Sequence, residues 1–223
     1  MNADFVSMDN AKNENTNNFS NPLSLRTNDL KLEERDDKSK EHQSTNDNYE
    51  GLVNQNVIYR TAIFNNKRIQ IYQYKTFPKN YLQSVYELLG SELSEPYNIF
   101  LLKTILKNYS EIALMCLCDE ECVGTVISKI TTKCKNDEPT TFGYICMIAV
   151  HKSVRSCGLG TYLLNESIKL MQDLYGINEV QLEAEATNKP TLRFYEKNGF
   201  IRVKRKPYYY LSGVDAFKLR KTL

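Results

Sequence analysis

A turn with two glycines, set between an apolar run and a helical pattern, is the feature of this sequence best suited to ligand binding. The run Tyr144–Val150 ends at His151, and Arg155-Ser-Cys-Gly158-Leu-Gly160 follows just before residues with helical spacing. The first N–H groups of a helix have no partner inside it, and the helix dipole adds partial positive charge there. Glycines let the backbone approach a ligand closely, so this strand, turn and helix could hold a diphosphate.

The glycines alone do not separate a diphosphate site from an ordinary turn between a strand and a helix. The motif Arg155-x-x-Gly158-x-Gly160 lacks the Lys-Ser/Thr pair of a P-loop and the third glycine of a dinucleotide-binding turn. Both interpretations stay open on these residues, and the choice depends on what lies further along the chain.

Two glutamates on an alternating segment are candidates for acid–base chemistry. Residues 179–187 alternate, which predicts a strand with Val180, Leu182, Ala184 and Ala186 on one face and Gln181, Glu183, Glu185 and Thr187 on the other. Two like charges close together raise the pKa of one carboxyl, as suits a general base near neutral pH. The same pattern also fits a solvated strand face with no catalytic role.

The elements that must position these residues follow from the hydrophobic periodicity. We expect helices from Asn80 to Gly90, from Pro96 onward, from Gly160 to Gly176 and from Asn188 to Asn198. We expect strands at Ile69–Tyr74, Ile112–Cys118, Cys122–Ile130, Tyr144–Val150, Glu179–Thr187, Phe200–Val203, Tyr208–Leu211 and Ala216–Leu219. Lys133–Thr141 is predicted to be a polar connection and Lys204–Lys206 a basic loop. Hairpins followed by helical crossovers predict an α/β fold with a mixed sheet and helices on both faces.

The 223 residues allow one domain plus a tail. Residues 1–56 contain 12 Asn and carry a net charge of −5, so we expect an Asn-rich, acidic and disordered extension. Residues 57–223 carry a net charge of +7, which suits a polyanionic ligand such as a nucleotide or ribosomal RNA. The charge is too mild to establish nucleic-acid binding, and we expect neither DNA nor a membrane as a partner.

The sequence also predicts the cellular compartment and the absence of a metal site. Residues 1–20 have no apolar core of a signal peptide, and no apolar run reaches the roughly 20 residues that span a bilayer. Six cysteines without such a signal suggest reduced thiols and a cytoplasmic protein. Cys116, Cys118 and Cys122 lack zinc-site spacing, so we expect core residues and no bound metal.

The glycine turn together with a later motif resembles the GNAT superfamily of N-acetyltransferases. Asn188-Lys-Pro-Thr-Leu-Arg-Phe-Tyr195 followed by Gly199-Phe200 is similar to the second hallmark of that superfamily, and it lies at the expected distance from Arg155–Gly160. The resemblance implies a GNAT domain at 57–223 with a mostly antiparallel central sheet. It also implies a splayed pair of strands at the acetyl-CoA site.

A closer resemblance is to the catalytic subunits of NatC-type N-terminal acetyltransferases. It rests on Leu93-Ser-Glu-Pro-Tyr97, Leu182-Glu-Ala-Glu185, Thr187-Asn-Lys189 and Tyr209-Tyr-Leu-x-Gly-Val-Asp-Ala216. It implies acetyl transfer from acetyl-CoA to the α-amine of protein N-termini that begin Met-Leu, Met-Ile or Met-Phe. It further implies a large auxiliary subunit, a small Sm-like subunit and contact with the ribosome.

The resemblance also implies roles for individual residues. Glu183 would be the base, acting directly or through a water, and Tyr195 would be the acid that protonates the leaving thiolate, although Tyr195 also fits a core aromatic. The acetyl-CoA site would be formed by Ile148, Ala149, Val150, Arg155, Ser156, Cys157, Gly158, Leu159, Gly160, Thr161, Asn188 and Tyr195. The peptide site would be formed by Leu93, Glu95, Pro96, Tyr97, Glu183, Tyr209 and Tyr210.

Two other functions remain open from the sequence. The same fold could acetylate a lysine or a small amine, although the lysine pKa near 10.4 demands a stronger base than the α-amine pKa near 8. A module that binds acetyl-CoA and docks on the ribosome without catalysis would also fit the basic domain, but Glu183 and Tyr195 argue for an enzyme.

Overall fold

The computed structural model describes residues 57–95, 98–135 and 138–223. The expected disordered extension at 1–56 lies outside these residues, as do Pro96 and Tyr97 of the predicted peptide site. In chain order, the strands and helices are β1 (Arg60–Phe64), β2 (Lys67–Gln73), η1 (Tyr74–Thr76), η2 (Lys79–Tyr81), α2 (Leu82–Glu92), α3 (Ile99–Asn108), β3 (Leu114–Cys118), β4 (Glu121–Lys135), β5 (Glu138–Val150), η3 (Lys152–Val154), α4 (Leu159–Tyr175), β6 (Glu179–Glu185), α5 (Lys189–Lys197), β7 (Ile201–Lys206) and β8 (Ala216–Thr222).

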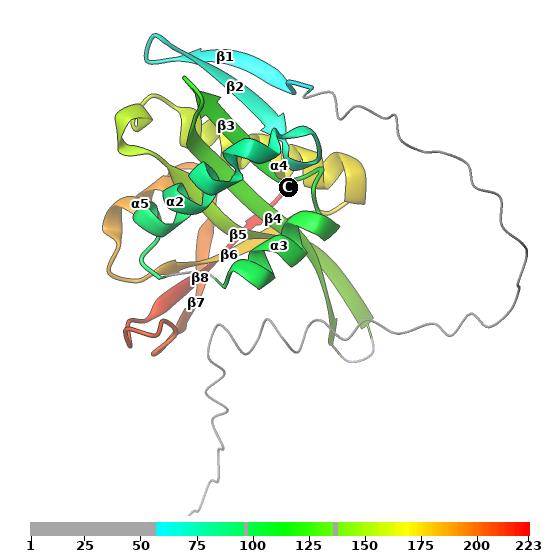
Figure 1. The fold of residues 1–223 in the computed structure, drawn as a ribbon. Helices are drawn as coiled ribbons and strands as arrows, with labels where there is room; N and C mark the ends of the chain where they lie inside the picture. Colours follow the sequence, from blue (N-terminus) through cyan, green and yellow to red (C-terminus); the bar gives the residue numbers. More distant parts are fainter. Residues whose placement is uncertain (1–56, 96–97, 136–137) are drawn as a thin grey trace, which may run out of the picture. The chain divides into compact units, whose positions relative to one another are not determined.

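The eight strands of this described part form one sheet in the order β1-β2-β3-β4-β5-β6-β8-β7. Neighbouring strands are antiparallel, except that β5 and β6 are parallel. Figure 1 shows α2 and α3 over one face of the sheet and α4 behind it. Each face has its own apolar cluster: α2 and α3 contribute to one, and α4 and α5 to the other. The predicted mixed sheet with helices on both faces is therefore confirmed.

The predicted polar connection at Lys133–Thr141 is wrong, because β4 and β5 form one long hairpin. Lys133 lies opposite Thr140 and Lys135 opposite Glu138. Threonine favours extended backbone, and the Thr132 and Thr141 hydroxyls are 3.0 Å apart across the strands. Pairing therefore continues past the apolar part of each strand, where hydrophobic periodicity carries no signal.

The C-terminal hairpin also differs from the prediction. Lys204–Lys206 lies in β7 rather than in a loop, and Tyr208–Leu211 is a loop rather than a strand. Asp215 fixes this loop, since its carboxylate accepts from the Tyr208 backbone N–H at 2.9 Å and from Arg205 Nε at 2.7 Å. The strand that pairs with β7 is therefore β8.

Two helix ends follow from local capping, and one predicted helix end is wrong. Helix α2 continues through Gly90 to Glu92, so the predicted stop at Gly90 is wrong. Asn98 begins α3, because its side chain accepts from the Phe100 N–H at 2.8 Å. Gly176 ends α4, as predicted, and it adopts the left-handed conformation that favours glycine. Strand β1 was absent from the sequence prediction.

Candidate active site

Strands β5 and β6 separate from one another after a short parallel contact. Their register consists of Gly143 opposite Val180 and Tyr144 opposite Gln181. Beyond this point β5 continues along β4 to Val150, while β6 continues along β8 to Glu185. A bulge in β5 lies at the same place, because Ile145 and Met147 pair with successive residues of β4 and leave Cys146 extra. The predicted splayed strand pair is therefore present.

The register identifies which amides of β5 face the gap between the separated strands. The His151 N–H donates to the Val123 carbonyl of β4 at 2.9 Å. N–H groups alternate in direction along a strand, so Ala149 also faces β4, whereas Ile148 and Val150 face the gap. Consistent with this direction, the Val150 carbonyl accepts from Arg155 Nε at 3.0 Å. Of the three amides that the sequence suggested, Ile148 and Val150 remain as donors for a ligand, and Ala149 does not.

The glycine turn delivers the start of α4 to the same end of β5. Gly158 has φ 92° and ψ −7°, a conformation that favours glycine. The Tyr162 N–H is the first to bond inside the helix, to the Gly158 carbonyl at 2.9 Å. Leu159 is buried in the core and anchors the turn. The N–H groups of Leu159, Gly160 and Thr161 precede the first helical bond and can donate to an anion.

Arg155 connects this turn to α2. Its guanidinium bonds to the Glu92 carboxylate, and its side chain is 54% exposed against 12% for Glu92. The predicted contact of Arg155 with phosphate remains a prediction; the visible role of Arg155 is to brace the turn against β5 and α2. Ser156, next in the chain, has φ 59° and is exposed, and the Cys157 thiol donates to the Val154 carbonyl at 2.8 Å.

Glu183 lies on β6 beside the gap, and its side chain is only 7% exposed. The Tyr144 hydroxyl of β5 donates to Glu183 Oε2. Lys206 Nζ, from β7, donates to Glu183 Oε1 at 2.5 Å. The alternative of a solvated strand face is therefore wrong for Glu183. Glu185 instead accepts from the Thr187 hydroxyl, so the neighbour that matters for Glu183 is a cation rather than the second carboxylate.

Tyr144 and Lys206 were missed by the sequence reasoning. Burial, followed by the nearby Glu183 carboxylate, raises the pKa of Tyr144 well above its ordinary value, so the phenol stays protonated and donates. Lys206 Nζ also lies 4.7 Å from the centre of the Tyr209 ring. Residues 204–206 are consecutive cations without alternation, and no sequence signal pairs Lys206 with Glu183.

The two segments predicted to flank a peptide meet in the structure. The Ser212 N–H, from the loop between β7 and β8, donates to Glu95 Oε1, after α2, at 3.3 Å. Tyr209 and Tyr210, in the same loop, pack edge to face with ring centres 5.3 Å apart. Leu93 packs against the apolar cluster under α2 and α3. The structure therefore brings Glu95 together with the loop that carries Tyr209 and Tyr210, and Leu93 lies two residues before Glu95.

Helix α5 packs against the glycine turn. The exposed Asn188 caps it by accepting from the Thr191 N–H at 3.1 Å. A Cβ on Gly160 would lie 3.5 Å from Phe194, so the two helices are in contact. Tyr195 is 6% exposed and packs edge to face on Phe194 and Phe200. Tyr195 is thus a core aromatic, and its role as an acid remains a prediction.

The Acetyltransferase (GNAT) family model matches residues 82–200, which include α2, the splayed strands, the glycine turn and α5. The chain belongs to the GNAT family of acetyltransferases. The matched region lies inside the predicted domain at 57–223.

Two relatives and one solved structure show the range of similarity. N-alpha-acetyltransferase MAK3 of Arabidopsis thaliana is 38% identical over 143 residues, which are 64% of this chain and 72% of that protein. N-alpha-acetyltransferase 30 of Xenopus laevis is 37% identical over 139 residues, 62% of this chain and 50% of that protein. A crystal structure of the NatC complex bound to Gag peptide and CoA contains a chain with 30% identity and a TM-score of 0.62, covering 70% of this chain and 98% of that chain. The GNAT fold predicted from the sequence is confirmed.

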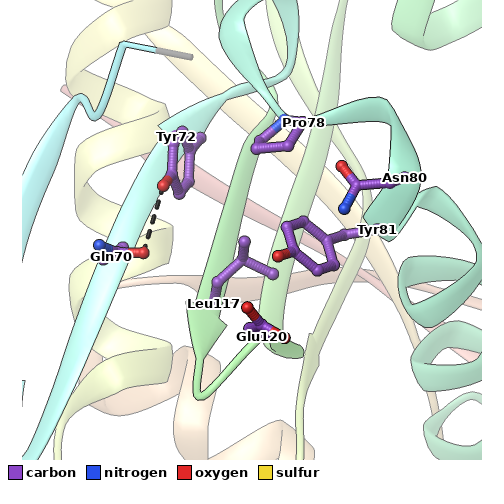
Figure 2. A pocket seen from close by; sticks show the side chains of 7 residues that line it. All are labelled: Gln70, Tyr72, Pro78, Asn80, Tyr81, Leu117 and Glu120. Atoms are coloured by element: carbon purple, nitrogen blue, oxygen red, sulfur yellow. Dashed lines mark hydrogen bonds between the residues drawn. The ribbon is translucent and has the colours of Figure 1, made fainter.

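A pocket of this GNAT chain lies away from the splayed strands. Its volume is about 260 Å³, and Figure 2 shows the Tyr72 hydroxyl bonded to Gln70 at its wall. The other lining residues are Pro78, Asn80, Tyr81, Leu117 and Glu120. None of these belongs to the predicted acetyl-CoA or peptide sites.

Three cysteines of the GNAT domain are core residues. Cys116, Cys118 and Cys122 are buried as predicted, and burial raises the pKa of Cys122 to about 12. Within the described ranges no cluster of three or more His, Cys, Asp or Glu is placed to hold a metal ion. The same ranges contain no helix long and apolar enough to cross a bilayer.

Proposed function

We propose that this GNAT enzyme transfers acetyl from acetyl-CoA to the α-amine of protein N-termini, with preference for Met-Leu, Met-Ile and Met-Phe starts. The observation that carries the proposal is the buried Glu183 carboxylate beside the gap toward which the Ile148 and Val150 amides point. Support also comes from the two relatives, which are named as N-alpha-acetyltransferases, and from the similar chain in a NatC complex that holds a peptide and CoA.

In the proposed reaction the glycine turn holds the cofactor and the gap holds the acetyl group. The amides of Leu159, Gly160 and Thr161 would bind the diphosphate of acetyl-CoA, with Ser156, Cys157 and Asn188 lining its path. The thioester carbonyl would then lie within reach of the Ile148 or Val150 N–H, which would stabilise the oxyanion.

Glu183 would accept the proton of the attacking amine, directly or through one water. The α-amine has a pKa near 8, so a modest base is sufficient. The neutral amine forms a bond to the acetyl carbon, the carbon–sulfur bond breaks, and the thiolate leaves with a proton that we assign to Tyr195. Tyr144 would fix the orientation of Glu183, since its hydroxyl bonds to that carboxylate. No metal takes part in these steps.

The peptide would enter between the two loops that meet at Glu95 and Ser212. Leu93 from one loop and Tyr209 and Tyr210 from the other would form apolar pockets for the first side chains; Pro96 and Tyr97, which the sequence also predicts for this site, lie outside the described residues. Glu95 would contact the α-amino end. A bulky apolar second residue therefore matches the chemistry of these walls better than a small polar one.

The proposal extends to partners and compartment. The similar chain belongs to a NatC complex, so we propose a large auxiliary subunit and a small Sm-like subunit here as well. A net charge of +7 over residues 57–223 favours contact with ribosomal RNA near the exit of the nascent chain, in the cytoplasm.

Initial rates with matched peptides test the proposed function. The full chain is incubated with acetyl-CoA and peptides that start Met-Leu, Met-Ile, Ser or Ala, and with an α-blocked peptide that offers only lysine. We expect the Met-Leu and Met-Ile peptides to be acetylated fastest, with mass spectrometry placing the acetyl group on the α-amine. Faster transfer to Ser, Ala or lysine, or binding of acetyl-CoA without transfer to any peptide, would contradict the proposal.

A further inference from the structure

The carboxylate proposed as the base is bonded through both of its oxygens. The Tyr144 hydroxyl occupies Oε2, and the Lys206 ammonium lies 2.5 Å from Oε1. Lys206 is the last residue of β7 and is 27% exposed. A carboxylate can accept a proton without a cation beside it, so this ion pair needs an explanation other than general-base catalysis.

The position of the Lys206 ammonium bears directly on the substrate. To transfer its proton to Glu183, the incoming α-amine must come within hydrogen-bond reach of that carboxylate or be one water away. A lone buried carboxylate would hold the α-amine as an ammonium ion, because opposite charges favour the charged form. The ammonium ion has no lone pair, so it would bind well and react poorly.

We propose that Lys206 is a positioning residue that offsets the charge of Glu183, so that the substrate α-amine binds in its neutral, nucleophilic form. This inference rests on the proposed function. It explains why a cation contacts Glu183. It also gives β7 a part in the reaction, because β7 carries the lysine that offsets the charge of the base.

Other charged or titratable groups face the same region, and none makes the contact that Lys206 makes. Lys218 of β8 is the cross-strand partner of Glu183, and burial, followed by nearby Lys133, lowers the pKa of Lys218. Lys129 of β4 lies 5.7 Å from the centre of the Tyr144 ring. Tyr209 of the β7–β8 loop and Cys146 of β5 interact electrostatically with Tyr144, and Glu95, proposed to contact the α-amino end, accepts from the Ser212 N–H. Within the described part of the chain, the ion pair of Glu183 is with Lys206.

The chain offers a matched control on the same strand. Lys204 is exposed, two residues before Lys206, and has the same charge. Lys204→Met therefore removes one positive charge from β7 without removing the contact to Glu183. Lys206→Met removes both, and Lys206→Arg keeps the charge while changing the head group.

The test is the pH dependence of kcat and KM for a Met-Leu peptide, measured with the full chain from pH 5.5 to 9.5. We expect Lys206→Met to move the acid limb of the kcat profile upward by about one pH unit, the size expected for one adjacent charge. At pH 7 kcat should then fall about tenfold, while KM stays unchanged or falls. Lys206→Arg and Lys204→Met should keep the wild-type midpoint.

Several results would overturn the inference. One is a Lys206→Met enzyme with the wild-type midpoint, and another is the same shift in Lys204→Met. An equal shift in Lys206→Arg would show that charge is not the cause. If Lys206→Met does not fold, as judged by thermal melting, Lys206→Gln takes its place. The pH dependence of kcat is then compared between Lys206→Gln and Lys206→Arg. Failure of the wild-type chain to acetylate any N-terminal peptide would instead overturn the proposed function itself, and the inference with it.

Discussion

The conformation of Gly158 gives the sharpest prediction about the acetyl-CoA site. Its φ of 92° lies in the region that costs a residue with a Cβ about 1–2 kcal/mol. No atom lies within 4 Å of the place where that Cβ would be, so the cost of Gly158→Ala is conformational rather than steric. The turn must either keep its shape under strain or relax into a different one.

Both responses can be measured, and the free energies lost in stability and in binding should add up to the conformational cost of the substitution. If the turn keeps its shape, the melting temperature falls by about 2–8 °C, since each kcal/mol is worth roughly 2–4 °C in a domain of this size. If it relaxes, the turn must be restored on binding, and the Kd for acetyl-CoA rises by about five- to thirtyfold. Calorimetric titration with acetyl-CoA and thermal melting of the same samples should together recover about 1–2 kcal/mol.

Gly160→Ala is the matched control for Gly158→Ala. A Cβ there would lie 3.5 Å from Phe194 and 3.7 Å from Val150, which are ordinary contacts. Alanine also has the higher helix propensity, so this variant should melt at or slightly above the wild-type temperature. It serves as a control for stability only, because Gly160 belongs to the proposed diphosphate site. If Gly158→Ala melts and binds acetyl-CoA as the wild type does, the reasoning from the shape of the turn is refuted.

Three further predictions concern the base, the acid and the alkaline stability. Glu183→Gln should lower kcat by about 10²–10⁴-fold and leave the Kd for acetyl-CoA nearly unchanged in titration calorimetry, and wild-type turnover would remove Glu183 from the mechanism. Tyr195→Phe should lower kcat and flatten the alkaline limb of the pH–rate profile, whereas an unchanged profile would leave Tyr195 as a core aromatic only. Burial, followed by the hydrogen bond to Glu166, raises the pKa of Tyr59 from 10 to about 12. The protonated Tyr59 hydroxyl therefore stabilises the fold fully below pH 10, and this stabilisation is lost as the pH rises to about 12. Urea unfolding of Tyr59→Phe should therefore show a smaller loss of free energy between pH 10 and 12 than wild type, and equal losses would contradict this assignment.

Much of the fold could be predicted because its buried elements alternate or repeat with helical spacing. The face of β6 that carries Val180, Leu182 and Ala184 is buried as the alternation predicts. The Asn188 cap and the left-handed glycine at 176 could be predicted from local chemistry alone.

The wrong predictions concern strands that are stabilised by backbone pairing rather than by burial of apolar side chains. The outer part of the β4–β5 hairpin is exposed, so its side chains show no hydrophobic pattern. Strand β7 is an edge strand rich in lysine and arginine. Such a composition protects an edge strand from pairing with other chains, but in a sequence it is also typical of a loop.

The contacts of Glu183 depend on the order of strands in the sheet. Residues 144, 183 and 206 meet because β5 and β8 flank β6 and β7 pairs with β8. Spacing along the chain contains no information about this order. The sequence could therefore suggest the carboxylate, while the phenol and the ammonium that bond to it required the structure.

A crystal structure of the full chain with a bisubstrate analogue, CoA joined through acetyl to the α-amine of a Met-Leu peptide, tests the central claim most directly. We predict the diphosphate on the amides of Leu159–Thr161, the acetyl oxygen on the Ile148 or Val150 N–H, and the substrate nitrogen within reach of Glu183, directly or through one water. A diphosphate bound away from this turn, or a substrate nitrogen on the opposite face of the sheet from Glu183, would contradict the account.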